Sequence, residues 1–361
     1  MTFDLKTEEG LLSYLTKHLS LDVAPNGVKR LSGGFVNVTW RVGLNAPYHG
    51  HTSIILKHAQ PHLSSDIDFK IGVERSAYEY QALKIVSANS SLLGSSDIRV
   101  SVPEGLHYDV VNNALIMQDV GTMKTLLDYV TAKPPISAEI ASLVGSQIGA
   151  FIARLHNLGR ENKDKDDFKF FSGNIVGRTT ADQLYQTIIP NAAKYGIDDP
   201  ILPIVVKELV EEVMNSEETL IMADLWSGNI LLQFDENSTE LTRIWLVDWE
   251  LCKYGPPSLD MGYFLGDCFL VARFQDQLVG TSMRQAYLKS YARNVKEPIN
   301  YAKATAGIGA HLVMWTDFMK WGNDEEREEF VKKGVEAFHE ANEDNRNGEI
   351  TSILVKEASR T

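Results

Sequence analysis

Hydrophobic and polar positions alternate along much of the first third of the chain, a pattern typical of β-strands. Gly33-Gly34 interrupts one such pattern and Asn112-Asn113 another, and both pairs are typical of hairpin turns. A helix is expected between these strands, around residues 74–86. The strand-like runs are 28–42, 53–57, 106–111 and 114–117. The first region is therefore predicted to be a small, mostly antiparallel sheet with one helix.

The hydrophobic spacing becomes helical after Met117. Apolar residues recur with a 3.6-residue period from about Ser137 to Leu158, which predicts a long amphipathic helix. Further helices are expected at 201–216 and from residue 258 onwards. A sheet-rich N-terminal lobe, residues 1–118, should thus precede a larger, mostly helical C-terminal lobe, residues 119–361. The predicted fold class is α+β.

Two strand-like segments stand out within the helical region. They are 229–234 and 243–248, and turn-forming residues separate them. If the two strands pair as a hairpin, Asn229 faces Asp248 at its open end, because paired strands lie ~5 Å apart. Two oxygen-bearing side chains at that distance can share one hard cation such as Mg²⁺. Asp224 lies in the loop just before the first strand, near the same end.

Composition narrows the class of protein. The 361 residues include 44% hydrophobic ones, which supports a sizeable core, and no apolar run approaches the ~18 residues of a membrane span. The net charge of -13 argues against a nucleic-acid partner, whose phosphates attract basic surfaces. The two cysteines fit no zinc or disulfide pattern, and the first residues do not resemble a secretory signal. A cytoplasmic location is the simplest expectation.

The spacing of Asp224, Asn229 and Asp248 suits phosphoryl transfer. A divalent ion typically takes one or two protein oxygens together with phosphate oxygens, and Asn229 and Asp248 offer such oxygens. Asp224 is then free to orient a hydroxyl group and accept its proton. An Asp followed by Asn five residues later is common by chance, so the hairpin and Asp248 carry most of this interpretation.

Three stretches resemble the aminoglycoside phosphotransferase and choline kinase-like family, which shares the protein-kinase fold. They are ADLWSGNILL (223–232), WLVDWE (245–250) and GPPSLDMGYFL (255–265). The resemblance implies that Asp224 is the catalytic base and that Asn229 and Asp248 bind Mg²⁺. It also implies that Asp260 mainly braces the catalytic loop.

The N-terminal lobe resembles the same family at LSGGFVNVTWRV (31–42). By this resemblance the backbone of Gly33 and Gly34 covers the phosphates of ATP, and Lys57 pairs with those phosphates. Glu79 matches the family pattern for the carboxylate that holds the lysine. Glu74 is the alternative, and because five helical residues separate the two, only one of them can face inward.

The segment LIMQDVG (115–121) resembles the hinge of the family, where backbone groups from Gln118 to Val120 would meet adenine. His156, near the end of the long helix, is interpreted as a packed histidine. Met222-Ala223 stands where the family usually has His-Gly. A nucleotide-binding pseudokinase without turnover is therefore kept as the alternative to an active kinase, and a metal-dependent hydrolase would leave Lys57 unexplained.

The phosphate acceptor is expected to be a small alcohol bound beside Asp224. Aromatic and acidic side chains near it suit an amine or ammonium group, although ordinary helix packing explains a stripe around Trp315 equally well. The candidates are Trp226, Trp249, Glu250, Asp267, Trp315, Asp317 and Trp321. An amino sugar, choline or ethanolamine, methylthioribose and other small alcohols all fit, and the sequence does not determine the oligomeric state.

Overall fold

The computed structural model describes residues 3–31, 36–62, 68, 70–93, 98–235 and 239–359. The chain forms two compact units, and each of them is discontinuous in sequence. The first unit comprises Met1–Asn89, Val102–Thr122 and Asp248–Leu251. The second comprises Ser90–Ser101, Met123–Val247 and Cys252–Thr361. Four residues from the middle of the C-terminal half, including Asp248, therefore belong to the N-terminal unit.

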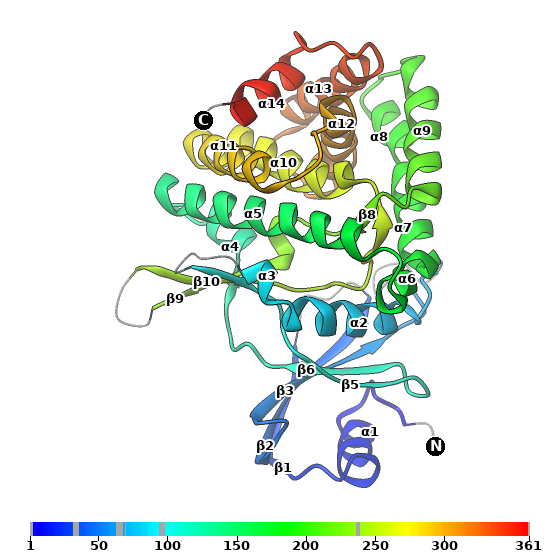
Figure 1. The fold of residues 1–361 in the computed structure, drawn as a ribbon, viewed down its shortest axis with the longest axis vertical. Helices are drawn as coiled ribbons and strands as arrows, with labels where there is room; N and C mark the ends of the chain where they lie inside the picture. The colour runs from blue at the N-terminus through cyan, green and yellow to red at the C-terminus, as the bar shows by residue number, and fades with distance from the viewer. Residues whose placement is uncertain are drawn as a thin grey trace. The chain divides into compact units, whose positions relative to one another are not determined.

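The first unit is built on a five-stranded antiparallel sheet with the order β1-β2-β3-β6-β5 (Figure 1). Helix α2 (Arg75–Ala88) packs against β5 and β6. A short helix, α1 (Glu8–Ser13), begins at an N-cap threonine and continues as one π-helical turn, η1 (Tyr14–His18). The strands are β1 (Val23–Leu31), β2 (Asn37–Tyr48), β3 (His51–Ala59), β5 (Gly105–Asp109) and β6 (Ala114–Gln118).

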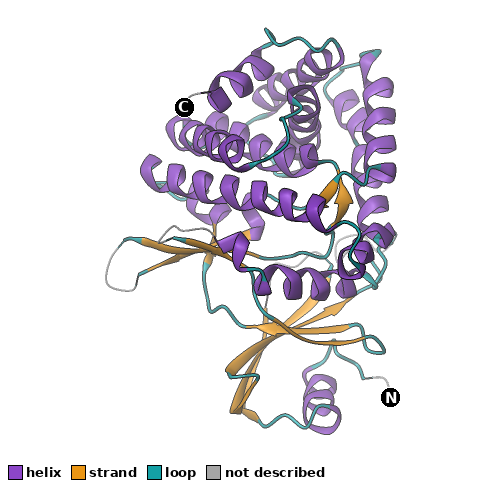
Figure 2. Cartoon of the chain, in the orientation of Figure 1, coloured by secondary structure: helices purple, strands orange, loops and turns teal. Residues whose placement is uncertain are grey.

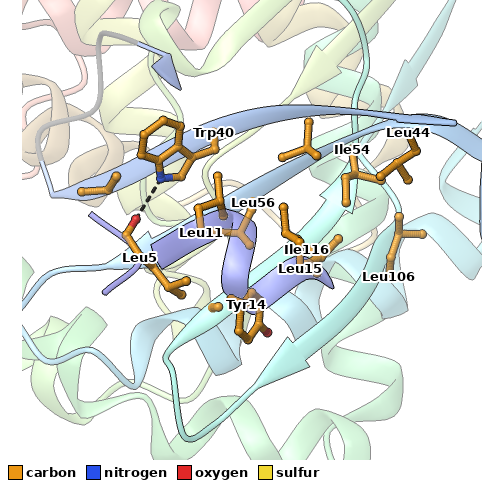
Figure 3. Close-up of a cluster of buried hydrophobic side chains, with 13 residues drawn as sticks. Leu5, Leu11, Tyr14, Leu15, Trp40, Leu44, Ile54, Leu56, Leu106 and Ile116 are labelled. Carbon is orange, nitrogen blue, oxygen red and sulfur yellow. Dashed lines mark hydrogen bonds between the residues drawn. The ribbon is translucent and has the colours of Figure 1, made fainter. Parts of the chain in front are cut away.

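The core of the first unit lies where the N-terminal helix meets the sheet (Figure 3). Alternate residues of β2 are buried, as the sequence pattern predicts for a strand with one covered face. Trp40 projects from β2 into this core, and its Nε1–H donates a 2.9 Å hydrogen bond to the carbonyl oxygen of Leu5. The buried indole therefore also fixes the chain before α1.

The second unit is mostly helical (Figure 2). Its longest helix, α5 (Ala138–Asn162), begins at the N-cap Ser137 and extends four residues beyond the predicted end. Helix α10 (Pro257–Phe274) has a proline in its first turn, where the missing N–H costs no hydrogen bond. The others are α3 (Ser90–Leu93), α4 (Leu126–Thr131), α6 (Asp166–Lys169), η2 (Phe170–Gly173), α7 (Ile175–Tyr185), α8 (Ile188–Lys194), α9 (Ile201–Asn215), η3 (Ser227–Asn229), α11 (Gln277–Asn294), α12 (Tyr301–Phe318), α13 (Asp324–Asn342) and α14 (Glu349–Ser359).

Two small sheets complete the second unit. The predicted hairpin is confirmed as β9 (Ile230–Phe234) and β10 (Leu241–Leu246), with Ile230 opposite Leu246. Strand β4 (Arg99–Ser101) adds in parallel to β10, and β7 (Lys124–Thr125) adds to β9. A two-stranded ribbon of β8 (Thr219–Ile221) and β11 (Lys253–Gly255) leads into the loop that carries Asp224. The sequence pattern did not predict β4 or this ribbon, because three-residue strands are too short to show a period.

The predicted fold class is confirmed, since a small antiparallel sheet accompanies a larger, mostly helical unit, although the sheet packs against the N-terminal helix as well as against α2. Gly33 and Gly34, like residues 236–238 between β9 and β10, lie outside the described residues. Within the described ranges, none of the helices combines the length and the hydrophobicity that crossing a bilayer requires.

Candidate active site

Asp224 lies in a short loop between β8 and β9, and its side chain is partly exposed. The side-chain amide of Asn229, at the end of the same loop, donates to Asp224 twice. Its Nδ2 is 2.7 Å from Asp224 Oδ2 and 3.0 Å from the Asp224 carbonyl oxygen. The amide nitrogen is thus used to hold the carboxylate, and this orientation leaves the amide oxygen of Asn229 for another ligand.

Asp260, a fully buried residue of α10, anchors the start of this loop. It accepts hydrogen bonds from the backbone N–H groups of Met222 (3.0 Å) and Ala223 (2.7 Å). His156 Nε2 lies 3.1 Å from the same carboxylate, and its other ring nitrogen bonds to the hydroxyl of Tyr291 at 2.8 Å. The bracing contact predicted for Asp260 is confirmed, and His156 is a buried packing residue as predicted.

Ala223 occupies the position where the family usually has glycine, and its backbone has φ = 65°. That left-handed conformation costs an L-residue roughly 1–2 kcal/mol. Because Asp260 bonds to the N–H of Ala223 and of the preceding residue, the loop keeps this conformation without a glycine. The departure from His-Gly is therefore compatible with an ordered loop before Asp224.

Lys57, on β3 of the first unit, is held between two carboxylates. Its Nζ lies 2.8 Å from Glu79 Oε2, 2.9 Å from Glu79 Oε1 and 2.6 Å from Asp248 Oδ1. Burial disfavours the charged lysine, but the carboxylates of Asp248 and Glu79 outweigh it and raise the pKa of Lys57. The choice of Glu79 over Glu74 as the lysine partner is confirmed, while the role of the pair toward a nucleotide stays a prediction.

Arg75, at the start of α2, joins three segments of the first unit through one fully buried guanidinium. Nη2 donates to the carbonyl of Val36 (2.8 Å) and to Asn37 Oδ1 (2.9 Å). Nε donates to Glu250 Oε2 at 3.1 Å, and Asn37 Nδ2 reaches the same oxygen at 2.9 Å. Sequence reasoning missed Arg75 because its partner Glu250 is 175 residues away.

Three carboxylates of the first unit, those of Glu79, Asp248 and Glu250, lie within 4.8 Å of one another. Lys57 occupies the oxygens of Glu79, and Arg75 with Asn37 engages Glu250. Asp248 has the most exposed side chain of the three, at 33%. It is therefore the carboxylate best able to bind an incoming cation.

The predicted pairing of Asn229 with Asp248 is wrong by one residue, because Ile230 lies opposite Leu246 and Asn229 therefore lies opposite Val247. The backbone N–H of Val247, the residue before Asp248, donates to the carbonyl oxygen of Asn229 at 3.0 Å. Asp248 itself has φ = 67°, a conformation that aspartate tolerates better than most residues. The shared metal site that was predicted for the two side chains stays a prediction.

The predicted hinge follows β6. The N–H of Gln118 donates to the carbonyl of Glu104 at 2.8 Å, so it is already used by the protein. Val120 lies beyond the strand and is partly exposed. Between them, Asp119 accepts hydrogen bonds from Ser53 Oγ (2.6 Å) and Arg41 Nη2 (3.1 Å), which fixes the segment. Whether Gln118 and Val120 meet adenine stays a prediction.

The aromatic candidates for an acceptor pocket separate into buried and accessible ones. Trp249 is fully buried and Trp321 is 6% exposed, while the buried Glu250 accepts a hydrogen bond from Arg75. None of these side chains presents an accessible surface. Trp226, two residues after Asp224, is partly exposed and stacks on Trp315 with ring centroids 5.9 Å apart and planes 14° apart.

Acidic candidates on the same side have structural partners. Asp267 accepts the N–H of Ser227 at 2.7 Å and contacts His311 Nε2 at 3.2 Å, which connects the loop that carries Asp224 to α12. Asp317 bonds to Lys194 Nζ at 2.7 Å and to the hydroxyl of Tyr195 at 3.0 Å. Both acidic candidates are therefore engaged by other side chains or by the backbone, whereas Trp226 and Trp315 are partly exposed.

Comparisons with known proteins identify relatives of the chain. Residues 142–300 match the ecdysteroid kinase-like family. The chain is 74% identical over 360 residues to the 4-hydroxytryptamine kinase of Psilocybe cubensis, covering 99% of each protein. It is 23% identical over 305 residues to phosphotransferase FrzJ of a Cladobotryum species, covering 75% of this chain and 76% of that one. A GDP complex of aminoglycoside 2'-phosphotransferase-IIIa aligns with a TM-score of 0.49 and 13% identity over 94% of this chain and 98% of that chain.

Proposed function

Because this chain belongs to the family of small-molecule kinases that contains the 4-hydroxytryptamine kinase of Psilocybe cubensis, we propose that it phosphorylates the aromatic hydroxyl group of a hydroxytryptamine. The chain is a kinase of a small-molecule hydroxyl group, and its predicted place in the aminoglycoside phosphotransferase and choline kinase-like family is confirmed. The hydroxytryptamine acceptor, ATP as donor and the residue roles below are the proposal.

Asp224 is the proposed catalytic base. A base must lie at an accessible position and hold its carboxylate in one orientation toward the reacting hydroxyl. Asp224 meets both conditions, because its side chain is partly exposed and Asn229 fixes Oδ2 at 2.7 Å. This anchored and accessible carboxylate is the observation that carries the proposal. Its role is to orient the acceptor hydroxyl and to take its proton as the phosphoryl group transfers.

Asn229 and Asp248 are the proposed ligands of Mg²⁺. The donor set fits a hard cation, since both side chains offer oxygen and the amide nitrogen of Asn229 is already turned toward Asp224. Bound there, the ion would neutralise charge on the phosphates. Lys57, held by Glu79 and also bonded to Asp248, is the proposed partner of the same phosphates.

The remaining nucleotide contacts are proposed for backbone groups of the first unit. Gly33 and Gly34 would cover the phosphates, and the hinge from Gln118 to Val120 would meet adenine. Support comes from the segments next to them, because Arg75 fixes Val36 and Asn37, and Asp119 is fixed by Ser53.

An aromatic acceptor agrees with the surface near the base. Trp226 and Trp315 present two stacked, partly exposed indoles within the unit that carries Asp224. Phe318, 58% exposed, meets the ring of Trp315 edge-on at 5.1 Å. Flat aromatic groups favour offset or edge contacts with such rings, and a protonated side-chain amine gains from an aromatic face as well. A hydroxytryptamine offers both features.

Turnover with a matched set of acceptors tests the proposal. We expect ATP- and Mg²⁺-dependent formation of a phosphate ester from 4-hydroxytryptamine, none from tryptamine, and weak or no reaction with choline, ethanolamine or kanamycin. The product is identified by mass spectrometry and ³¹P NMR. Phosphorylation of choline or kanamycin in preference to the hydroxytryptamine would refute the proposed acceptor, and nucleotide binding without any phosphorylated product would favour the pseudokinase.

The variant Asp224→Asn tests the base. It keeps the shape of the side chain and removes its basicity, so kcat should fall by ~10²–10⁴ while nucleotide binding is retained. The control is Asp198→Asn, at an exposed aspartate of the same unit, which should keep wild-type turnover. If Asp224→Asn keeps full turnover, another group accepts the proton.

A further inference from the structure

Lys253 is a buried cation on the ribbon that precedes the catalytic loop. Its side chain is 0% exposed, and among the described residues its Nζ has no hydrogen-bond partner. Burying an ammonium group without a partner is costly, so such a lysine requires a reason. In the β8–β11 ribbon Lys253 pairs directly with Ile221, three residues before Asp224.

The charged surroundings of Lys253 are contributed by four elements. Burial is the largest influence and lowers the pKa of Lys253 to about 8. The carboxylate of Asp260 on α10 opposes this effect, as do Cys252, the residue just before β11, and Asp224 in the loop, whereas Arg178 on α7 reinforces it. Two of these neighbours, Asp260 and Asp224, are the residue that anchors the catalytic loop and the proposed base.

We propose that Lys253 is a positioning residue for phosphoryl transfer, whose buried ammonium attracts the carboxylates of Asp260 and Asp224 and so holds the catalytic loop in its reactive arrangement. Lys253 acts through these two side chains and does not contact the substrate, since it is fully buried. The proposal rests on the role proposed above for Asp224.

A role in positioning predicts an effect on turnover rather than on binding. Charges within a protein interior interact strongly enough over several ångströms to change a rate about tenfold or more. The variant Lys253→Met keeps the length of the side chain and removes its charge. We expect kcat to fall by about tenfold or more, with the KM for ATP unchanged within about twofold.

The same variant should be more stable than the wild type, because the cost of burying the ammonium group exceeds the attraction of the two carboxylates, as the lowered pKa of Lys253 indicates. A lysine needed only for packing would show the opposite, a lower melting temperature. The matched control is Lys207→Met, at a lysine of the same unit whose side chain is 75% exposed. This control should change neither kcat nor the melting temperature.

The pH dependence provides a second, independent readout. The wild-type kcat should fall as the pH rises through about 8, where Lys253 loses its proton, and this alkaline decline should be absent from Lys253→Met. In the wild type the unfolded chain binds the lysine proton more tightly than the folded protein does. Its stability should therefore rise from pH 8 towards 10.5, and the stability difference between wild type and variant should narrow over that range.

Two results would overturn the proposal. One is unchanged kcat and an unchanged pH profile in Lys253→Met, and the other is a loss of turnover matched by loss of melting temperature and of ATP affinity. Turnover is measured with 4-hydroxytryptamine and, separately, as ATP hydrolysis without an acceptor. A wrong acceptor would abolish only the first readout in the wild type, which distinguishes it from a failure of the role of Lys253.

Discussion

Among single residues, Asp260 shows how much of a site can depend on a side chain that never meets the substrate. One carboxylate accepts two backbone N–H groups of the catalytic loop and contacts His156, all without exposure to water. In Asp260→Asn one oxygen becomes an amide that faces a donor, which leaves a buried N–H unsatisfied. We expect a loss of about 2–4 kcal/mol in the free energy of unfolding and a large loss of kcat.

Denaturant unfolding followed by fluorescence measures the first effect, and the hydroxytryptamine assay measures the second. The exposed control Asp198→Asn should change stability by less than about 0.5 kcal/mol. A stable and active Asp260→Asn would show that the conformation of Ala223 is maintained by other contacts.

Lys57 offers a second prediction at this scale, because the charges around it are buried unequally. The side chain of Glu79 is 1% exposed, whereas that of Asp248 is 33% exposed. Lys57→Met leaves Glu79 as a buried, unpaired carboxylate and should destabilise the protein by about 3–5 kcal/mol. The double variant Lys57→Met with Glu79→Met removes both charges and should recover most of that stability.

Measurements of turnover distinguish the contribution of the Lys57–Glu79 pair to stability from the proposed contact of Lys57 with the phosphates. Both the single and the double variant should lack turnover, because the ammonium group proposed to bind the phosphates is absent from both. Thermal unfolding and the kinase assay on all three proteins provide the comparison. If the double variant is as unstable as the single one, Lys57 stabilises the first unit through packing rather than through its charge.

At the scale of elements, the packing of α5 on α11 depends on two glycines. A Cβ atom at Gly149 would lie 2.3 Å from the carbonyl oxygen of Tyr287, and one at Gly145 would lie 2.1 Å from that of Met283. These neighbours are backbone atoms of α11 and cannot rotate away. Gly149→Ala should therefore cost about 2 kcal/mol or more, despite a gain of about 1 kcal/mol in helix propensity.

Thermal or denaturant unfolding of Gly149→Ala checks this expectation. Leu143→Ala is the matched control, because Leu143 lies on the same helix and is 42% exposed, so its loss should have little effect. A stabilised Gly149→Ala protein would mean that α5 and α11 can separate slightly without cost.

Local patterns allowed most of the elements and part of the site to be predicted from the sequence. The long helix α5 and the β9–β10 hairpin follow from spacing within one segment, whereas the choice of Glu79 over Glu74 followed from the family resemblance. Strand β4 and the β8–β11 ribbon were missed because they are three residues long. Arg75 and Lys253 were missed because their roles depend on partners that are distant in sequence or on burial.

For the whole molecule, nucleotide binding should appear as a gain in stability. A ligand at 100 times its dissociation constant adds ~2.7 kcal/mol to the free energy of unfolding if it binds only the folded protein. ATP with Mg²⁺ should therefore raise the melting temperature, and ATP with EDTA should raise it less, because Asn229 and Asp248 are the proposed metal ligands. A melting temperature unchanged by millimolar ATP and Mg²⁺ would contradict the proposed donor.

The variant Asp248→Asn refines this experiment. Asparagine also tolerates the positive φ of 67° at this position but carries no charge. The variant should keep its fold and lose most of the difference between the Mg²⁺ and EDTA measurements. An unchanged response to Mg²⁺ would place the ion on other residues.

The first unit has a sequence discontinuity that bears on its biosynthesis. Glu250, the partner of Asn37 and Arg75, lies 213 and 175 residues after them in the sequence. The fully buried Trp249 belongs to the same segment, Asp248–Leu251. When only the first 122 residues have emerged from the ribosome, Glu250 has not yet been synthesised. The buried guanidinium of Arg75 therefore still lacks its carboxylate partner. We expect the first unit to remain incompletely folded and accessible to chaperones until translation has passed residue 251.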